Sequence, residues 1–113
     1  METDCLFCKI AAGGIPVDVL YEDDELLAFR DIAPQAPIHF LIIPKKHIQN
    51  PAKITAEDEE LMGRMLRRGA AIAQENGAKD FRLVFNSGIE AGQTVFHIHM
   101  HVLGGRSMQW PPG

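Results

Sequence analysis

The segment from Phe96 to Arg106 reads FHIHMHVLGGR, and its histidines alternate with apolar residues. Because successive side chains of a β-strand point to opposite faces, the alternation predicts a strand over residues 95–103. One face of this strand is expected to join the core while the other carries chemistry. The chemical face holds His97, His99 and His101, and the apolar face holds Ile98, Met100 and Val102.

The row of histidines limits the chemistry that the strand can perform. Along a regular strand the outer two histidines lie roughly 13 to 14 Å apart, too far for one metal ion to bind all three. A neutral imidazole is a nucleophile and a proton carrier near pH 7. His99 is therefore the expected nucleophile, and a neighbouring imidazole would hold or deliver the proton that a leaving group requires. A solvated or hydrogen-bonded histidine face is the alternative, and it fits one histidine better than three.

The rest of the sequence predicts an α+β fold in a single domain over residues 1–113. Strands are expected at 17–21, 25–30, 39–43 and 81–85, which with the histidine strand make five. A long helix is expected over 54–76, with Thr55 as N-cap, Asp58 three residues on and Gly77 just after its end. A short helix is expected before Gly13. Strands that are neighbours in sequence, with one long helix inserted, predict an antiparallel sheet.

Composition narrows the classes of partner. The chain has a formal charge of -4 and a sequence pI near 5.7. A duplex nucleic-acid binder depends on Lys and Arg to neutralise phosphates, so no nucleic-acid partner is expected. No apolar run approaches the roughly 20 residues of a membrane span, and the N-terminus METDCLFCKI lacks the pattern of a signal peptide. The sequence thus predicts a soluble, cytoplasmic protein with no membrane partner.

The loop before the histidine strand, residues 86–94, is rich in hydrogen-bond donors. Asn86, Gln93 and Thr94 offer amide and hydroxyl groups, and Gly92 leaves backbone N–H groups unobstructed. Such donors can bind a phosphate or stabilise charge as it develops on one. Loops of this composition also form ordinary turns, so it is the position beside the histidines that indicates a phosphate site.

These residues resemble a known family. The run His97-Ile-His99-Met-His101-Val-Leu matches the His-φ-His-φ-His-φ-φ motif of the histidine triad (HIT) family. The chain is similar in particular to the Hint branch of that family, the purine nucleoside phosphoramidases. The resemblance covers nearly the whole chain, through YEDDELLAFRDIAPQAPIHFLIIPKKHI, the NSG…AGQTVFHIHMHVLGGR block and the terminal QWPPG.

The resemblance implies two-step hydrolysis of phosphoramidates of AMP or GMP. It implies that His99 forms a nucleotidyl-histidine intermediate, that His101 contacts the phosphate and assists proton transfer, and that His39 and His97 support them. Asn86, Gly92, Gln93 and Thr94 would lie around the phosphate and leaving group, Asp31 would bind the ribose hydroxyls, and Phe7, Ile10, Ile15, Phe29, Ile32 and Leu41 would form a slot for the purine. The residues alone leave alternatives open, since Asp31 is equally a turn residue and the apolar set equally an ordinary core.

The only two cysteines, Cys5 and Cys8, are too few for a disulfide framework, so their thiols are available for metal or redox chemistry. On one helical turn their sulfurs face the same way, and with His47 and His97 they could complete a tetrahedral zinc site. The HIT family has members with such a structural zinc and members without it; two small buried thiols are the alternative. No cofactor is expected for catalysis, because the sequence has neither a Walker loop nor a cluster of magnesium-binding carboxylates.

Trp110 lies in the C-terminal segment SMQWPPG, which would be loose unless it docks on another surface. In Hint-like proteins two subunits pair to extend the sheet, and the tail reaches toward the partner's site. The resemblance therefore implies a C2 homodimer in which Trp110 influences the leaving-group side of the substrate. An unstructured tail is the alternative.

Two other functional classes stay open. One is a nucleotide-binding or scaffolding module in which the same pocket binds AMP or GMP with weak or vestigial turnover. The other is a metalloenzyme that uses the HxH pair, and it is disfavoured because no carboxylate general base lies nearby in sequence. A histidine at position 99 favours the enzyme.

Overall fold

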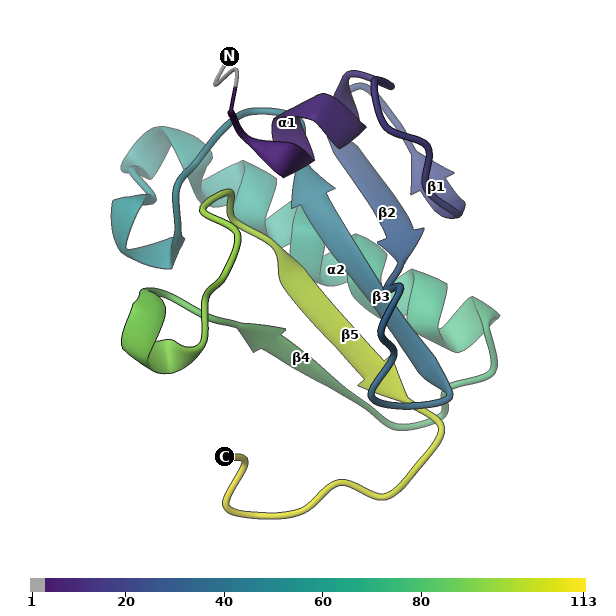
Figure 1. Ribbon diagram of the computed structural model, residues 1–113. Helices are drawn as coiled ribbons and strands as arrows, with labels where there is room; N and C mark the ends of the chain where they lie inside the picture. The colour runs from purple at the N-terminus through teal and green to yellow at the C-terminus, as the bar shows by residue number, and fades with distance from the viewer. Residues whose placement is uncertain (1–3) are drawn as a thin grey trace.

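The structure is a computed structural model that describes residues 4–113, so residues 1–3 of the predicted domain lie outside the described part. Five strands form one antiparallel sheet, with the long helix α2 across its rear face and the short helix α1 in front of its upper end (Figure 1). The predicted α+β fold is therefore confirmed. Among residues 4–113 no helix has the length and apolarity needed to cross a membrane.

The elements follow the chain in the order α1, three strands, α2 and two strands. Across the sheet the strands lie in the order β1-β2-β3-β5-β4. Their bounds are α1 Leu6–Ala11, β1 Val19–Glu22, β2 Leu26–Arg30, β3 Ile38–Pro44, α2 Glu59–Glu75, β4 Phe81–Phe85 and β5 Met100–Gly104. The first four strands lie within two residues of the predicted ranges.

The central strands are buried on both faces, and their alternate residues divide between two apolar clusters. Toward α2, Phe40 and Ile42 of β3 pack with Met65 and Ile72 of the helix. Toward α1, Leu41 and Ile43 of β3 pack with residues of β2 and α1. The second cluster contains Phe7, Ile10, Leu27, Phe29, Leu41 and Ile43. The face that carries α1 is therefore an apolar surface in its own right.

The start of α2 follows the predicted capping pattern with one correction. Thr55 and Asp58 form a capping box, in which the Thr55 N–H and the Asp58 carboxylate are 3.1 Å apart. The first turn after Thr55 is a 3-10 helix, Ala56–Asp58, so the α-helix begins at Glu59 rather than at 54. A tighter first turn is common at helix N-termini. At the other end Gly77 has φ +91, which confirms its left-handed conformation after the helix.

The prediction of a strand over residues 95–103 is wrong in its first half. β5 begins only at Met100, because β4 ends opposite it at Phe85 and β3 pairs no further than Ile42. The preceding backbone bonds elsewhere, and the N–H of Ile98 donates to the carbonyl of Ile48 over 2.6 Å. The division of faces nevertheless holds, since Ile98, Met100 and Val102 all lie in the core beneath α2.

Two glycines occupy contrasting positions beside the sheet. At Gly104, the last residue of β5, an added Cβ would lie 2.8 Å from the Cβ of Ala78 and 3.2 Å from the backbone oxygen of Asp80. At Gly63, on the exposed side of α2, an added Cβ would meet nothing within 4 Å. Glycine is thus required by packing at one position and not at the other.

We expect Gly104→Ala to lower the free energy of unfolding by about 1–3 kcal/mol, because neither atom that it meets is a flexible chain end. The matched variant Gly63→Ala should raise the free energy of unfolding by up to about 1 kcal/mol, since alanine is the better helix former. Urea denaturation of both variants measures the difference. Equal stability of the two variants would contradict the packing described here.

Candidate active site

A cavity of about 610 Å³ opens on the face of the sheet that carries α1. It lies between α1, the ends of β2 and β3, and the loop before β5. Of the residues predicted from the sequence, those that line it are Phe7, Ile10, Ile15, Phe29, Asp31, Ile32, Leu41, Asn86, Gly92, Thr94, His99 and His101. The fold therefore brings one predicted set, scattered over 95 positions of sequence, to one cavity.

The apolar part of the cavity is formed largely by the cluster on the α1 side. The Phe7 ring packs edge-on against Phe29, with centroids 5.7 Å apart, and against the ring of His99, at 5.0 Å. Ile32 differs from the others because it is 99% exposed, at the rim of the cavity. Five more residues line the cavity and were not predicted, since nothing in the local sequence distinguishes them from ordinary core, turn or strand-end residues; they are Leu6, Pro16, Val17, Arg30 and Val95.

His99 is oriented by its own backbone. Its Nδ1 lies 2.8 Å from the carbonyl oxygen of His97, so Nδ1–H donates and the lone pair is on Nε2. The ring is 7% exposed, and this burial lowers the pKa of His99 below the ordinary value of 6.5 despite the opposing hydrogen bond to His97. A neutral imidazole with a fixed tautomer is the form required of a nucleophile.

Two further histidines and one carboxylate lie beside His99. The rings of His99 and His101 are 5.1 Å apart, and His39 Nε2 is 2.9 Å from His101 Nδ1. Asp31 is a turn residue, since its Oδ1 accepts the N–H of Ala33, and its Oδ2 lies 3.4 Å from His39 Nε2. Burial lowers the pKa of His101 to about 4.

His97 lies outside the cavity, although it belongs to the same sequence motif. Its Nε2 is 2.7 Å from the carbonyl oxygen of Pro44, so Nε2–H donates and the Nδ1 lone pair faces the other way. The side chain is fully buried, which lowers the pKa of His97 to about 4. His97 is therefore neutral at pH 7 and offers a single directed lone pair.

That lone pair faces both cysteines and His47. His97 Nδ1 lies 3.3 Å from Cys5 Sγ, 3.4 Å from Cys8 Sγ and 3.2 Å from His47 Nδ1, and Cys8 Sγ lies 3.3 Å from His47 Nδ1. Ligand atoms around a tetrahedral zinc with two sulfur and two nitrogen ligands are roughly 3.3–3.8 Å apart. Four of the six separations among these ligand atoms are thus close to those of such a tetrahedron, and all four atoms lie within 4.8 Å of one another.

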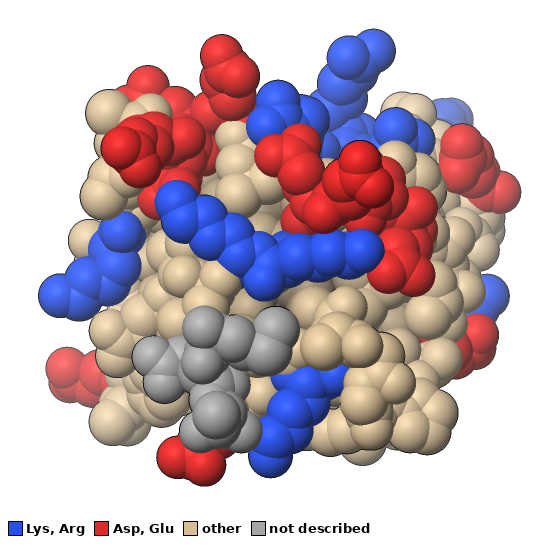
Figure 2. Space-filling view, turned by 90° about the horizontal axis from the view of Figure 1, so that it is seen from above, with Lys and Arg blue, Asp and Glu red and all other residues tan. Residues whose placement is uncertain are grey.

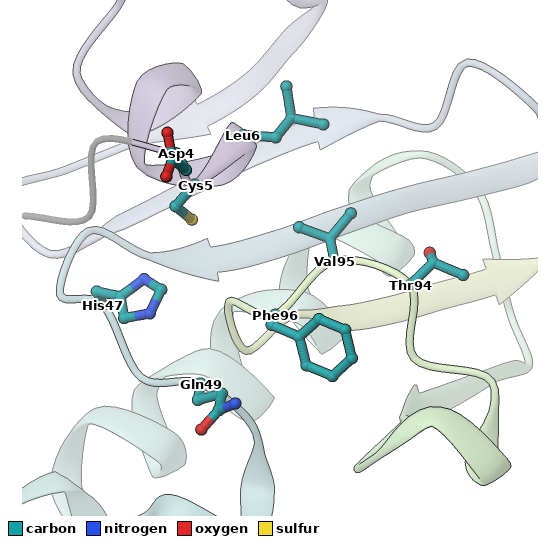
Figure 3. A pocket seen from close by; sticks show the side chains of 8 residues that line it. All are labelled: Asp4, Cys5, Leu6, His47, Gln49, Thr94, Val95 and Phe96. Carbon is teal, nitrogen blue, oxygen red and sulfur yellow. The ribbon is translucent and has the colours of Figure 1, made fainter.

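The cluster can be reached from outside. Cys5 and His47 line a second, open cavity of about 640 Å³, whose other walls include Gln49 and Phe96 (Figure 3). Thr94 and Val95 line both cavities, so the same short segment separates the cysteine cluster from His99. A metal ion would therefore have a path to the cluster that does not pass through the first cavity.

The loop of residues 86–94 brings only part of the predicted phosphate set to the cavity. Asn86, Gly92 and Thr94 line it, whereas Gln93 does not. The amide of Gln93 is buried and fully used within the protein: Oε1 accepts the N–H of Gly88, and Nε2 donates to the carbonyls of Gln49 and Val95. We therefore correct the expectation for Gln93, whose side chain holds the loop rather than facing a ligand.

Trp110 lies in the C-terminal segment, which runs beneath β4 in the view of Figure 1 and carries no helix or strand. Its side chain is 83% exposed and does not line the cavity of its own chain. The segment is held by Arg82 of β4, whose Nη2 donates to the carbonyl of Gln109 over 2.9 Å. The predicted role of Trp110 therefore depends on a second copy of the chain.

The face of the molecule shown in Figure 2 carries charges of both signs, with basic and acidic side chains next to one another. Lys45 pairs with Glu22 at 2.7 Å and Lys46 pairs with Asp58 at 2.6 Å. Each of these two lysines therefore has a carboxylate partner.

The buried histidines predict a particular response to pH. We expect His101 to titrate near pH 4 and to be neutral at pH 7, because burial disfavours its charged form. Since the unfolded chain binds that proton near pH 6.5, the free energy of unfolding should fall as pH is lowered from about 6.5 toward 4. NMR titration of the imidazole signals measures the first effect and urea denaturation the second. A His101 signal that titrates near 6.5 would contradict the burial described here.

Comparison with known proteins identifies the family. The family model described as scavenger mRNA decapping enzyme C-terminal binding matches residues 4–110. An HIT-like protein of Synechococcus elongatus is 52% identical over 114 residues, with both chains covered completely. Another, from Synechocystis sp., is 50% identical over the same length and with the same coverage.

Solved structures agree in fold and sequence. An HIT family hydrolase from Legionella pneumophila superposes with a TM-score of 0.95 at 54% identity, covering 97% of this chain and 100% of that one. A histidine triad protein from Clostridium difficile gives a TM-score of 0.92 at 40% identity, with 96% of each chain covered. With the histidine row, its cavity and these relatives in agreement, the chain belongs to the histidine triad family and has the fold of the HIT hydrolases.

Proposed function

We propose that this protein hydrolyses the phosphorus–nitrogen bond of purine nucleoside 5'-phosphoramidates in the cytoplasm. The observation that carries the proposal is His99, a buried neutral imidazole whose Nδ1–H is held by the His97 carbonyl while the ring lines a cavity of nucleotide size. The family gives the reaction class, because its solved relatives include proteins described as hydrolases. The nucleotide would be of AMP or GMP type.

The cavity offers a separate place for each part of a purine nucleotide. The base would lie in the apolar slot between α1 and the ends of β2 and β3, near Phe7, Phe29 and Leu41. The ribose hydroxyls would donate to the carboxylate of Asp31, as charge-assisted hydrogen bonds. Asn86 and Thr94 would then contact the phosphate, close to His99.

In the first step, His99 Nε2 attacks the α-phosphorus. A bond forms between Nε2 and phosphorus, the bond from phosphorus to the amine nitrogen breaks, and the amine leaves with a proton. In the second step water attacks the phosphorus and releases the nucleoside monophosphate, which restores the imidazole. An amine is a poor leaving group as an anion, so a hydrogen-bond donor at the reacting group matters in this reaction.

His101 would supply that donor. With Nδ1 accepting from His39 Nε2–H, the proton of His101 would be on Nε2, from which it can donate to a phosphoryl oxygen as negative charge develops there. The charge of a bound phosphate raises the pKa of the neighbouring imidazole, so that His101 can take up a proton from solvent and transfer it to the leaving amine. The water that attacks in the second step gives up a proton in return, as the bond between His99 Nε2 and phosphorus breaks. The reaction needs no metal or other cofactor in this scheme.

We also propose a structural zinc at Cys5, Cys8, His47 and His97. Three features support it: the four ligand atoms lie within 4.8 Å of one another, the hydrogen bond to Pro44 directs the His97 lone pair at the others, and an open cavity reaches them. When bound, the ion would tie α1, which supplies Phe7 to the base slot, to the segment that precedes His99. It would therefore act on stability and on the shape of the cavity rather than on the chemistry.

Gel filtration with light scattering tests a further part of the proposal, a C2 homodimer that continues the sheet and places Trp110 at the leaving-group side of the partner's cavity. The exposed Trp110 and the tail held by Arg82 support it. A monomer at micromolar concentration would overturn it.

A second candidate function is a nucleotide-binding or scaffolding module with weak turnover. The mostly apolar cavity supports nucleotide binding in either candidate, because the base slot would hold a nucleotide whether or not His99 reacts. The two candidates therefore differ at His99 alone.

We expect His99→Ala to lower turnover of an AMP phosphoramidate by at least about a thousandfold, because the nucleophile is lost. AMP should still bind, since neither the base slot nor Asp31 is altered. Wild-type protein mixed with substrate should show a transient mass increase of one nucleotidyl group, and the variant should show none. Turnover that survives in the variant, or a wild type that binds AMP but never reacts, would favour the binding module.

Removal of zinc should separate stability from chemistry. We expect Cys8→Ser to reduce zinc from about one ion per chain to well below one and to lower the melting temperature, because a structural site contributes to folding. Elemental analysis and thermal denaturation measure the two effects. Less than about 0.2 zinc per chain in wild type purified with metal retained would contradict the site. Loss of turnover by a chelator at a temperature where the fold persists would contradict the metal-free reaction.

A further inference from the structure

The proposed reaction leaves one contact of the site without a role. The backbone N–H of Gln35, in the loop between β2 and β3, donates to Nδ1 of His39 over 2.9 Å. A backbone N–H can only donate, so Nδ1 must accept, and the single proton of a neutral imidazole is then on Nε2. The Gln35 peptide thereby selects one of the two tautomers of His39.

The selected tautomer determines the next one. His39 Nε2–H faces two acceptors, His101 Nδ1 at 2.9 Å and Asp31 Oδ2 at 3.4 Å. With His39 as the donor, His101 accepts at Nδ1 and keeps its own proton on Nε2. The hydrogen bonds are thus donated in one direction, from the Gln35 N–H to His39 and from His39 to His101. The remaining donor, Nε2–H of His101, is the one that the proposed reaction uses.

Asp31, His39 and His101 also have the ligand types of a metal site, but the tautomer of His39 argues against metal binding there. Given their separations of 2.9, 3.4 and 3.9 Å, His39 Nε2, His101 Nδ1 and Asp31 Oδ2 lie about 2.0 Å from a common point, a zinc–ligand distance. A metal ligand needs a lone pair, whereas His39 Nε2 carries the proton that Gln35 assigns to it. His97 passes this test, because its proton is on the nitrogen away from the cysteines.

The backbone of Gln35 is also held at its carbonyl, in the next peptide unit. Arg106, just beyond β5, donates from Nε to the carbonyl of Gln35 and from Nη1 to the carbonyl of Ser107, each over 3.0 Å. Gly105 next to it has φ +88, and a Cβ at that position would lie 3.0 Å from the Cβ of Pro37. The start of the C-terminal segment is therefore packed against the loop that sets the tautomer of His39.

We infer that the Gln35 backbone and Arg106 form a positioning relay that fixes the tautomers of His39 and His101. Neither residue touches substrate. Arg106 holds the Gln35 carbonyl and so the backbone of that residue, the Gln35 N–H orients the His39 proton, and His39 orients the His101 proton. The consequence for turnover rests on the proposed function, whereas the tautomers themselves do not. The relay also connects the C-terminal segment to the chemistry through bonds within one chain.

Nitrogen-15 NMR of imidazole-labelled protein at pH 7 tests the relay directly, because the two ring nitrogens of each histidine report which one carries the proton. In wild type we expect His39 and His101 both protonated at Nε2 only. Gln35→Pro removes the N–H and keeps the carbonyl that Arg106 binds, and it should introduce the Nδ1–H form of His39. Gln35→Ala retains the N–H and should match wild type.

Arg106 provides a second route should proline disturb the loop. We expect Arg106→Met to mix the tautomers of His39, and Arg106→Lys to restore them in part, because lysine can still donate to the Gln35 carbonyl. Arg82→Met is the matched control: it removes an arginine bond to the carbonyl of Gln109 in the same segment without touching the loop, so the tautomers should not change.

Turnover gives an independent readout. We expect Gln35→Pro and Arg106→Met to lower kcat by roughly tenfold with little change in KM, the loss that one misdirected hydrogen bond produces. His39 protonated at Nδ1 in wild type, or unchanged tautomers in both variants, would overturn the relay even if wild type turns substrate over. The expected tautomers in a protein that does not hydrolyse phosphoramidates would refute the proposed function and leave the relay standing.

Discussion

The arrangement of the site depends on the antiparallel pairing of β3 with β5. In this register Leu41 lies opposite His101 and His39 lies opposite Leu103, so the two histidines are diagonal neighbours on one face. Diagonal side chains on adjacent strands are within reach of one another, which is why His39 Nε2 and His101 Nδ1 come to 2.9 Å. A slip of one residue in either strand would turn one of these rings toward α2 and abolish the contact.

The end of that pairing matters as much as the pairing. Because β4 and β3 give no ladder partners before Met100, the segment 95–99 leaves the sheet, and its histidines meet different surroundings. His97 enters the cysteine cluster, whereas His99 faces the cavity. Two rings separated by a single residue in sequence thus face two different surroundings, the cysteine cluster and the cavity.

Backbone groups set the chemistry of each histidine. The Pro44 carbonyl, the His97 carbonyl and the Gln35 N–H each bond one ring nitrogen, of His97, His99 and His39 in turn. Such partners cannot change their hydrogen-bonding character, so each tautomer is fixed by the fold rather than by pH. Burial lowers the pKa of all three rings and so favours their neutral form. Only a neutral imidazole has two tautomers, of which the backbone partner can select one.

The sequence by itself determined the α+β class, the positions of the strands to within two residues outside β5, and 12 of the 17 residues that line the cavity. It could do so because the period of two in strands and the capping of α2 are local, and because the histidine motif is specific to its family. The tertiary structure alone decided where β5 begins, the internal role of Gln93 and the parts of Gln35 and Arg106. These features depend on where neighbouring strands end and on hydrogen bonds of backbone groups between distant segments. The local pattern of side chains predicts neither of these.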